Sequence, residues 1–382
     1  MTVFDPTAPT LDVRDSLRAT WAEVNLGTLR RNFALIRERI SPSGIMLVVK
    51  ANAYGHGLVE VTKALSDQAD CVGVAVPEEG ILLRHQGVTA PILVLGGVWG
   101  DQIPLFIRHG LMLTASSVER LSQMEEAAKA MGRRAQVHLK IDTGMERLGI
   151  HYFNAHKLQE AALKCAHLDV MGIYSHFANA DAEDLAHAKL QLERFMEVLR
   201  FYEKISVETP TAHIANSAAT LRLPESHLDM VRPGLLLYGV YPSAHVPRTI
   251  PVTPALAWKS RVVYFKVVPA NHPVSYGSTW LAERPVRMVT IPVGYGDGYL
   301  RAMSNKSQVI INNRKYPQAG SICMDQTMVS IGCDSAYNGD EVILLGSSQN
   351  ETITVEDLAA WGDTVPYEVF TAINARVPRV CV

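Results

Sequence analysis

The chain has 382 residues, of which 48% are hydrophobic, so it can bury a large core and is long enough for two domains. Its formal net charge of -2 leaves no excess of basic residues for binding nucleic acid. The start of the chain lacks the basic and apolar regions of a signal peptide, and no later apolar run reaches membrane-spanning length. We therefore expect a cytoplasmic protein that binds neither nucleic acid nor membrane.

The five cysteines are odd in number, widely spread and without a CxxC pair. This distribution argues against a disulfide framework and against a zinc site, so we expect no metal. Cys323 is of interest only for its neighbours, and we expect it to act as a small residue beside Met324.

Apolar runs of strand length alternate with segments of helical period over about the first 250 residues. Such alternation predicts an α/β domain, and its length is that of a (β/α)8 TIM-type barrel, which needs about 250 residues. A doubly wound open sheet is the alternative arrangement. We expect the barrel to span residues 1–250, with strands at 45–50, 71–76, 91–97, 111–116, 135–142, 168–177, 213–217 and 229–234.

One predicted helix shows its buried face clearly. Apolar residues recur at helical spacing between residues 185 and 199, with charged residues opposite. The residues expected on the buried face are Leu185, Ala188, Leu192, Phe195, Met196 and Leu199.

From residue 251 onward the pattern changes to strands in quick succession without a long helix between them. We therefore expect a C-terminal mostly-β domain over residues 251–382. The pair Asn312-Asn313 predicts a hairpin turn, and the short segment 19–25 is expected to be a strand that joins this domain. The expected strands are 262–268, 287–293, 308–312, 327–331 and 341–345.

Residues 45–57 join an apolar strand to a lysine and a glycine-containing turn. Lys50 follows the run Ile45–Val49, at the point where a buried strand meets solvent. A desolvated lysine loses its proton readily and can form a Schiff base with an aldehyde such as pyridoxal phosphate. Gly55 and Gly57 permit a tight turn. A single lysine here could equally extend its amine into water, so the other strand ends must decide its role.

Reactive groups of a TIM-type barrel lie at the carboxyl ends of its strands, where some polar residues also occur simply because strands emerge into water. Gly234 after the eighth strand, with Ser217 from the strand before, suits a phosphate. Lys50 and this cradle would hold the two ends of pyridoxal phosphate. The polar set at the predicted strand ends comprises Lys50, Lys140, Arg147, His176, Asn216, Ser217, Arg232 and Gly234.

Seven motifs, in order from Trp21 to Arg379, resemble those of the alanine racemase family, whose members are fold-type III pyridoxal-phosphate enzymes. The lysine motif is the most specific of them. They are the segments 49–57 (VKANAYGHG), 138–149 (HLKIDTGMERLG), 216–217 (NS), 231–234 (VRPG), 275–277 (SYG), 294–298 (GYGDG) and 323–325 (CMD).

The resemblance implies a homodimer that interconverts L-alanine and D-alanine by two-base proton transfer and supplies D-alanine for cell-wall peptidoglycan. It implies that Lys50 carries pyridoxal 5'-phosphate as a Schiff base. It also implies that Arg232 faces the pyridine nitrogen. His176 is expected either to hold this arginine by hydrogen bonding or stacking, or to be a hydrogen-bonded histidine of the core. The remaining contacts to the cofactor would come from Tyr54, Asn216, Ser217, Gly234, Leu235 and Tyr367.

The catalytic residues implied by the resemblance come from two subunits. Lys50 would take the proton from D-alanine, and Tyr276, given across the dimer interface, would take that from L-alanine, because racemisation needs a base on each face of the α-carbon. Arg147 and Met324 would bind the substrate. Lys140 matches a lysine that is often carbamylated, and Tyr295 matches a residue of the entrance.

One residue departs from the family pattern. Glu146 stands where an asparagine is frequent, which adds a charge next to Arg147.

Three alternative functions remain. A broader-specificity amino-acid racemase of the same fold would share these motifs. A decarboxylase of this architecture normally sets a carboxylate against the pyridine nitrogen, which Arg232 contradicts. A cofactor-holding barrel without turnover would lack the β domain and leave Tyr276 without a role.

Overall fold

The computed structural model describes residues 18–382, which form two compact units. The α/β unit comprises Thr28–Ala53 and Leu58–Thr253. The mostly-β unit comprises Tyr54–Gly57 and Pro254–Val382 together with the described residues that precede Thr28.

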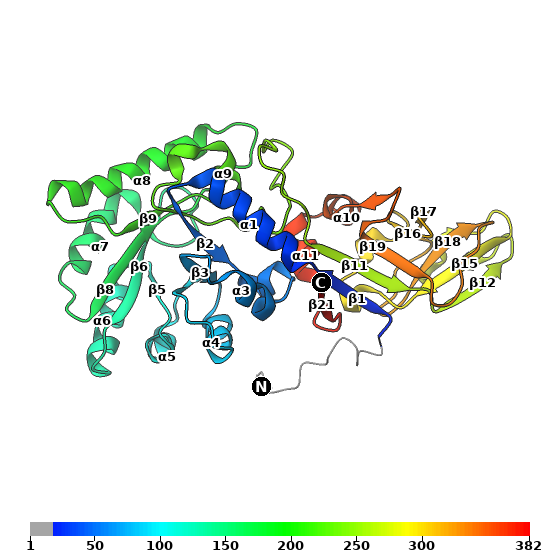
Figure 1. Ribbon diagram of the computed structural model, residues 1–382, viewed down its shortest axis with the longest axis horizontal. Coiled ribbons are helices and arrows are strands. Elements are labelled where there is room, and N and C mark those ends of the chain that lie inside the picture. The colour runs from blue at the N-terminus through cyan, green and yellow to red at the C-terminus, as the bar shows by residue number, and fades with distance from the viewer. Residues whose placement is uncertain (1–17) are drawn as a thin grey trace. The chain divides into compact units, whose positions relative to one another are not determined.

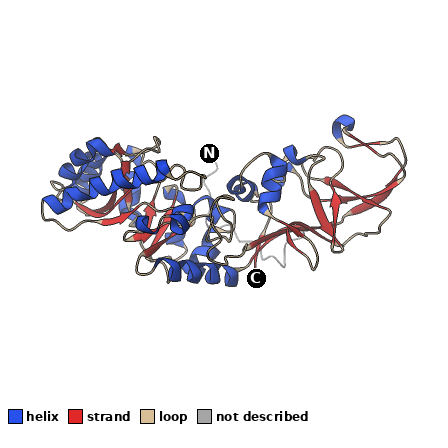
Figure 2. Ribbon diagram, turned by 90° about the horizontal axis from the view of Figure 1, so that it is seen from above, coloured by secondary structure: helices blue, strands red, loops and turns tan. Residues whose placement is uncertain are grey.

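Parallel strands form the centre of the α/β unit, and helices lie around them (Figures 1 and 2). The strands form two sheets, in the orders β10-β2-β3-β4 and β5-β6-β8-β9, with β7 paired on β6. A parallel bridge between Leu93 and Met112 joins the sheets at one edge, and a hydrogen bond from Arg232 N–H to the Ala215 carbonyl joins them at the other. The predicted (β/α)8 arrangement is therefore confirmed.

The strands of this unit match the predicted runs, although most are shorter. They are β2 (Gly44–Val48), β3 (Cys71–Val74), β4 (Ile92–Val94), β5 (Leu113–Ala115), β6 (Ala135–Asp142), β7 (Ile150–His151), β8 (Leu168–Tyr174), β9 (Thr211–His213) and β10 (Met230–Val231). The helices are α1 (Leu26–Ile40), α2 (Lys50–Tyr54), α3 (Leu58–Leu65), α4 (Pro77–His85), α5 (Ile103–His109), α6 (Val118–Ala130), α7 (Ala155–Ala162), α8 (Ala186–Lys204) and α9 (Ser217–Arg222). Within residues 18–382 no helix combines the length and apolar character that a membrane span requires.

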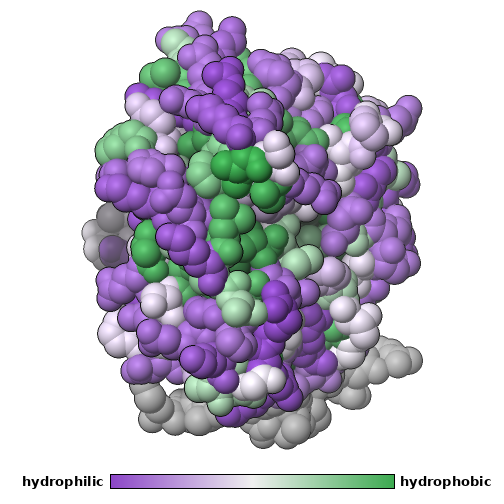
Figure 3. All heavy atoms as spheres, turned by 90° about the vertical axis from the view of Figure 1, so that its left-hand side faces the viewer, coloured by the Kyte–Doolittle hydropathy of each residue, from purple (hydrophilic) through white to green (hydrophobic). Residues whose placement is uncertain are grey.

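Helix α8 buries the predicted face with two exceptions, the first being Leu185, which precedes the helix as its N-cap residue and is half-buried. Leu192, Phe195 and Leu199 are buried, whereas Met196 is 39% exposed. Met196 lies at the edge of the apolar face, and the fully buried Gln191 takes a place within it. The Gln191 amide donates to the His176 carbonyl at 3.0 Å and accepts from the Ala178 N–H, so its burial leaves no polar group unpaired. Figure 3 views the molecule from the side of α7 and α8 and shows a band of apolar residues across a mostly polar face.

The mostly-β unit is built on a large sheet in the order β17-β16-β19-β11-β1-β21. The N-terminal strand β1 pairs antiparallel with β11 and parallel with β21. Asn312 and Asn313 join β16 to β17 with φ values of 50° and 62°, as the predicted hairpin turn requires. The strands of this sheet are β1 (Thr20–Val24), β11 (Leu256–Arg261), β16 (Gln308–Ile311), β17 (Arg314–Pro317), β19 (Glu341–Ser347), β20 (Thr352–Ile353) and β21 (Arg379–Cys381).

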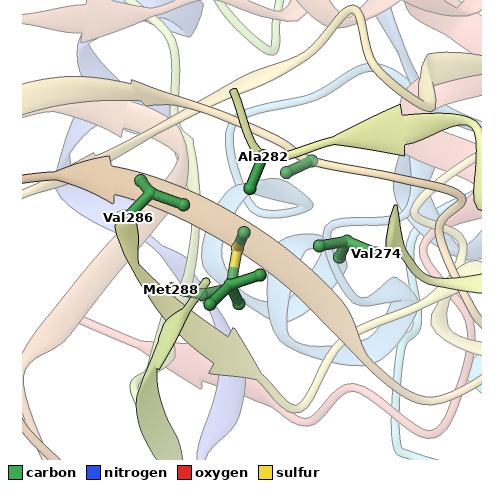
Figure 4. Packing of buried hydrophobic residues seen from close by; sticks show 6 residues of the cluster. Val274, Ala282, Val286 and Met288 are labelled. Carbon is green, nitrogen blue, oxygen red and sulfur yellow. The ribbon is translucent and has the colours of Figure 1, made fainter. Parts of the chain in front are cut away.

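A second, smaller sheet and a short hairpin support the segment that contains Tyr276. The sheet has the order β12-β15-β18, and β13 pairs with β14. Side chains from these strands pack into a buried apolar cluster at the base of the hairpin, including Val274, Val286 and Met288 (Figure 4). The elements are β12 (Tyr264–Val268), β13 (Pro273–Val274), β14 (Trp280–Leu281), β15 (Val286–Ile291), β18 (Thr327–Gly332), α10 (Val355–Gly362) and α11 (Pro366–Ala372).

Candidate active site

Lys50 lies just after β2, at the start of a left-handed turn. The next four residues, Ala51 to Tyr54, all have φ between 51° and 56°. This conformation costs an L-residue about 1–2 kcal/mol, so neighbouring contacts must hold the turn in place. Burial and the nearby guanidinium groups of Arg147 and Arg232 lower the pKa of Lys50. More of its amine is therefore unprotonated near neutral pH than in an ordinary lysine.

Arg232, directly after β10, is buried, and its guanidinium group is held by four acceptors. One nitrogen donates to His213 Nδ1 at 2.8 Å. The other donates to the carbonyls of Ser175 at 2.7 Å and Ile214 at 3.1 Å, and to His176 Nδ1 at 3.2 Å. Burial lowers the pKa of Arg232 to about 10, so it keeps its proton at neutral pH. None of these four acceptors carries a negative charge.

Two histidines behind Arg232 have tautomers that the geometry fixes. A guanidinium group can only donate, so His213 Nδ1 must accept, and the proton of His213 lies on Nε2. Nε2 then donates to His138 Nδ1 at 2.9 Å. Burial lowers the pKa of His138 to about 3, and burial together with Arg232 also lowers that of His213. Gly172 makes room for this pair, because a Cβ there would lie 2.4 Å from His138 Nδ1.

The carboxyl end of β6 places Lys140 and the loop of Arg147. Lys140 is buried and donates to the Ile141 carbonyl at 2.9 Å. Burial, and then the charge of Arg232, lower its pKa to about 7. The Asp142 carboxylate accepts hydrogen bonds from three backbone N–H groups of this loop, including that of Arg147 at 3.2 Å. Asp142 thus orients the backbone that carries Arg147, whose own side chain is exposed.

Ser217 and Gly234 meet as expected, although Ser217 does not lie on a strand. The predicted strand 213–217 was placed too late in the chain, because β9 spans Thr211–His213 and Ser217 opens helix α9. The Asn216 side chain caps this helix by accepting from the Ala219 N–H at 3.0 Å. Ser217 Oγ accepts from the N–H of Gly234 at 2.8 Å and of Leu236 at 3.2 Å, so Leu235 lies between two anchored residues.

In the mostly-β unit, Tyr276 and Met324 present their side chains to the outside. Their exposed fractions are 72% and 52%. The Ser321 hydroxyl donates to the Tyr276 carbonyl at 2.8 Å and so fixes the turn behind the ring. The N–H groups of Tyr295 and Gly296 donate to the carbonyls of Cys323 and Met324, which ties the Tyr295 segment to the Met324 loop.

The same unit brings Tyr54 close to Tyr367. Their ring centroids lie 6.1 Å apart. Burial raises the pKa of Tyr54, so its hydroxyl remains a neutral donor. Gly55 is required beside it, because φ is 77° and a Cβ would lie 2.1 Å from the Phe370 carbonyl oxygen.

The α/β unit has the donor set that an anionic, aldehyde-bearing cofactor needs. Several cations meet at the strand ends, where the charges of Arg147 and Arg232 help to lower the pKa values of Lys50 and Lys140, and the region has an excess of positive charge. A hydroxyl and backbone N–H groups suit a phosphate, and an amine with a lowered pKa suits an aldehyde. The residues therefore fit pyridoxal phosphate. The cations are Lys50, Lys140, Arg147 and Arg232, and the phosphate cradle consists of the Ser217 hydroxyl and the backbone at Gly234 and Leu235, which the hydrogen bonds to Ser217 Oγ hold in place.

Comparison with known proteins identifies the family of this chain. Residues 24–242 match the family model "Alanine racemase, N-terminal domain", and residues 255–381 match "Alanine racemase, C-terminal domain". An alanine racemase of Carboxydothermus hydrogenoformans is 44% identical over 369 residues, covering 96% of this chain and 100% of that protein. One of Symbiobacterium thermophilum is 41% identical over 367 residues, covering 96% and 97%.

Solved structures give the same result. The alanine racemase of Streptomyces lavendulae has a TM-score of 0.92 and 37% identity, covering 96% of this chain and 98% of that one. The enzyme of Bacillus anthracis, solved with bound L-Ala-P, has a TM-score of 0.89 and 34% identity, covering 96% and 95%. A lysine-bearing barrel with an anion cradle and a β domain defines the fold-type III pyridoxal-phosphate enzymes. Within that class, the chain belongs to the alanine racemase family.

Proposed function

We propose that this enzyme interconverts L-alanine and D-alanine with pyridoxal 5'-phosphate as its cofactor, and that D-alanine for peptidoglycan is its product in the cell. The observation that carries the proposal is that one unit contains both Lys50, whose pKa is lowered by burial and by Arg147 and Arg232, and the Ser217 and Gly234 cradle. The B. anthracis relative, solved with L-Ala-P, supports an alanine-sized substrate.

The chain's own residues would hold the cofactor at three points. The amine of Lys50 would bind its aldehyde, and Arg232 would face its ring nitrogen. The phosphate would lie against the Ser217 hydroxyl and the backbone at Gly234 and Leu235. Tyr54, Asn216 and Tyr367 would complete this set, and His176 would support Arg232, to which it is hydrogen-bonded.

Two bases are proposed to move the proton of the alanine α-carbon. Bound pyridoxal phosphate would supply an electron-withdrawing ring that makes this proton acidic. Once the substrate's amino group has taken its place on the cofactor, the Lys50 amine, whose pKa burial has lowered, would serve as the base or acid on one face of the α-carbon. The partner subunit's Tyr276 would serve the opposite face, so that a proton removed by one residue is replaced from the other side by the second. Arg147 and the partner subunit's Met324 N–H would hold the substrate carboxylate.

Arg232 would limit how much negative charge the ring accepts. Its donors are satisfied by neutral groups, and a guanidinium group cannot transfer a proton to the ring nitrogen. We infer that this favours rapid return of the proton and suppresses side reactions. Tyr295 is proposed to line the entrance, because its N–H group is tied to the Met324 loop.

Lys140 is proposed to carry a carbamate. Carbamylation by CO₂ needs a neutral amine, and the pKa of Lys140 is lowered to about 7. The resulting anion would pair with Arg147 and remove the repulsion that the charges of Arg232 and Arg147 exert on a protonated Lys140.

A racemisation assay with L- and D-alanine, together with an absorbance spectrum of the pyridoxal-phosphate-loaded protein, tests the function. Turnover of both enantiomers and loss of the cofactor band in Lys50→Ala are expected. Serine, lysine and arginine as substrates separate an alanine enzyme from a broad racemase. Colourless protein, or cofactor bound at another lysine, would contradict the proposal.

A further inference from the structure

Glu79 lies in the first turn of α4, and its carboxylate joins the ends of two barrel strands. Oε1 accepts a hydrogen bond from the Ala51 N–H at 2.6 Å, and Oε2 accepts one from the Ala75 N–H at 2.8 Å. Ala51 directly follows Lys50, whereas Ala75 directly follows β3. The carboxylate therefore bridges the backbone after the lysine to the neighbouring strand.

The turn that Glu79 contacts needs outside support, because consecutive L-residues in it are left-handed. Its later part has other bonds, since the Asn52 side chain accepts from the Leu58 N–H at 2.8 Å and the Ala53 N–H donates to the Val49 carbonyl. Glu79 supplies the contact at the first peptide of the turn, next to Lys50.

Glu79 also opposes the cations around the lysine. Arg147 and Arg232 lower the pKa of Lys50, and the Glu79 carboxylate raises it. Its neighbour Glu78 is exposed and belongs to the same helical turn. A carboxylate that served only the start of α4 would need the Ala75 bond but not the bond to Ala51.

We propose that Glu79 is a positioning residue for the reactive lysine: by bridging Ala51 and Ala75 it fixes the left-handed turn and thereby the direction in which the Lys50 amine points. The inference takes from the proposed function only that Lys50 is the reactive amine.

The test compares Glu79→Gln with Glu78→Gln in the full-length protein, since both remove one negative charge from the same turn. In Glu79→Gln one carboxylate oxygen becomes an NH₂ group, which cannot accept from an N–H. Hydrogen exchange of residues 50–57 should become about tenfold faster in Glu79→Gln and stay unchanged in Glu78→Gln. The kcat for alanine should fall about tenfold or more in Glu79→Gln alone, because displaced catalytic groups lose rate steeply.

Faster exchange confined to α4 would show a helix-capping role and overturn the inference, as would unchanged exchange in both regions. If Glu79→Gln does not fold by circular dichroism, Glu79→Asp replaces it. Aspartate keeps the charge but is too short to bridge both N–H groups, so the same faster exchange at 50–57 is expected. Hydrogen exchange does not depend on turnover. A wild-type protein without racemase activity would therefore reject the proposed function, while the exchange of residues 50–57 would still decide whether Glu79 fixes the turn.

Discussion

Arg232 and Lys140 lie in one buried region, but their protonation states depend on pH in different ways. Arg232 keeps its proton because its pKa falls only to about 10, whereas the pKa of Lys140 falls to about 7. The first residue is therefore a fixed charge at neutral pH. About half of the Lys140 amine is unprotonated at neutral pH, and this fraction changes within the physiological pH range.

Replacing Arg232 by glutamate should expose the role of its fixed charge. A carboxylate there would stabilise the protonated form of the ring nitrogen and so make the bound cofactor a stronger electron sink, and we expect new long-wavelength absorbance and side reactions such as transamination. Arg232→Lys is the control, because it keeps the positive charge but cannot reach all of the acceptors around His213 and Ser175. It should lose rate without the new absorbance. An unchanged spectrum and product profile in Arg232→Glu would contradict the assignment.

Carbamylation of Lys140 should depend on pH with a midpoint near 7. An ordinary lysine with a pKa of 10.5 has little neutral amine at pH 8, whereas Lys140, at about 7, is mostly neutral. Raising the pH through 7 in bicarbonate buffer should therefore increase the CO₂ adduct on the peptide that contains Lys140, and acid should remove it. Native mass spectrometry measures the adduct, with the exposed Lys157 as the internal control. A bare Lys140 amine at pH 8 would reject the proposal.

At the scale of the element, α2 is an unfavourable backbone turn that begins at Lys50, the proposed reactive lysine. The exposed Ala51 has φ 53° and ψ 54°. Glycine adopts this conformation readily, so Ala51→Gly should raise the free energy of unfolding by about 0.5–1 kcal/mol after its greater chain entropy is subtracted. Ala360→Gly, in the right-handed helix α10, should instead lower it by about 0.5–1 kcal/mol. Chemical denaturation measures both, and destabilisation by Ala51→Gly would contradict the expectation.

The elements show what the sequence could and could not predict. Strand runs, the lysine motif and the Asn312-Asn313 turn carry strong local patterns, and they predicted the barrel, the β domain and the hairpin. The left-handed turn after Lys50 was not predicted, because its residues have no glycine until Gly55 and the conformation depends on contacts such as that of Glu79. His138 and His213 were missed as a pair because they lie on different strands, and only the fold brings them together.

At the scale of the whole molecule, the proposed mechanism divides each active site between two subunits. Lys50→Ala and Tyr276→Phe should each be nearly inactive alone. Mixing them after denaturation and refolding should restore about a quarter of the sites, because half of the dimers are then hybrids with one complete site. No recovery would place the tyrosine in the same subunit as its lysine. Specific activity of the wild type should also fall on dilution, and a fully active monomer in sedimentation would contradict the shared site.

The position of β1 between β11 and β21 has a consequence for how the protein is made. Thr20–Val24 is synthesised before Leu256–Arg261 and Arg379–Cys381, the two strands with which it pairs. The main sheet of the β unit thus contains contacts between residues that are far apart in sequence, and it can close only once Arg379–Cys381 has been synthesised. Until those residues have been made, the backbone N–H and C=O groups of β1 cannot pair with the strands that flank it in the folded sheet.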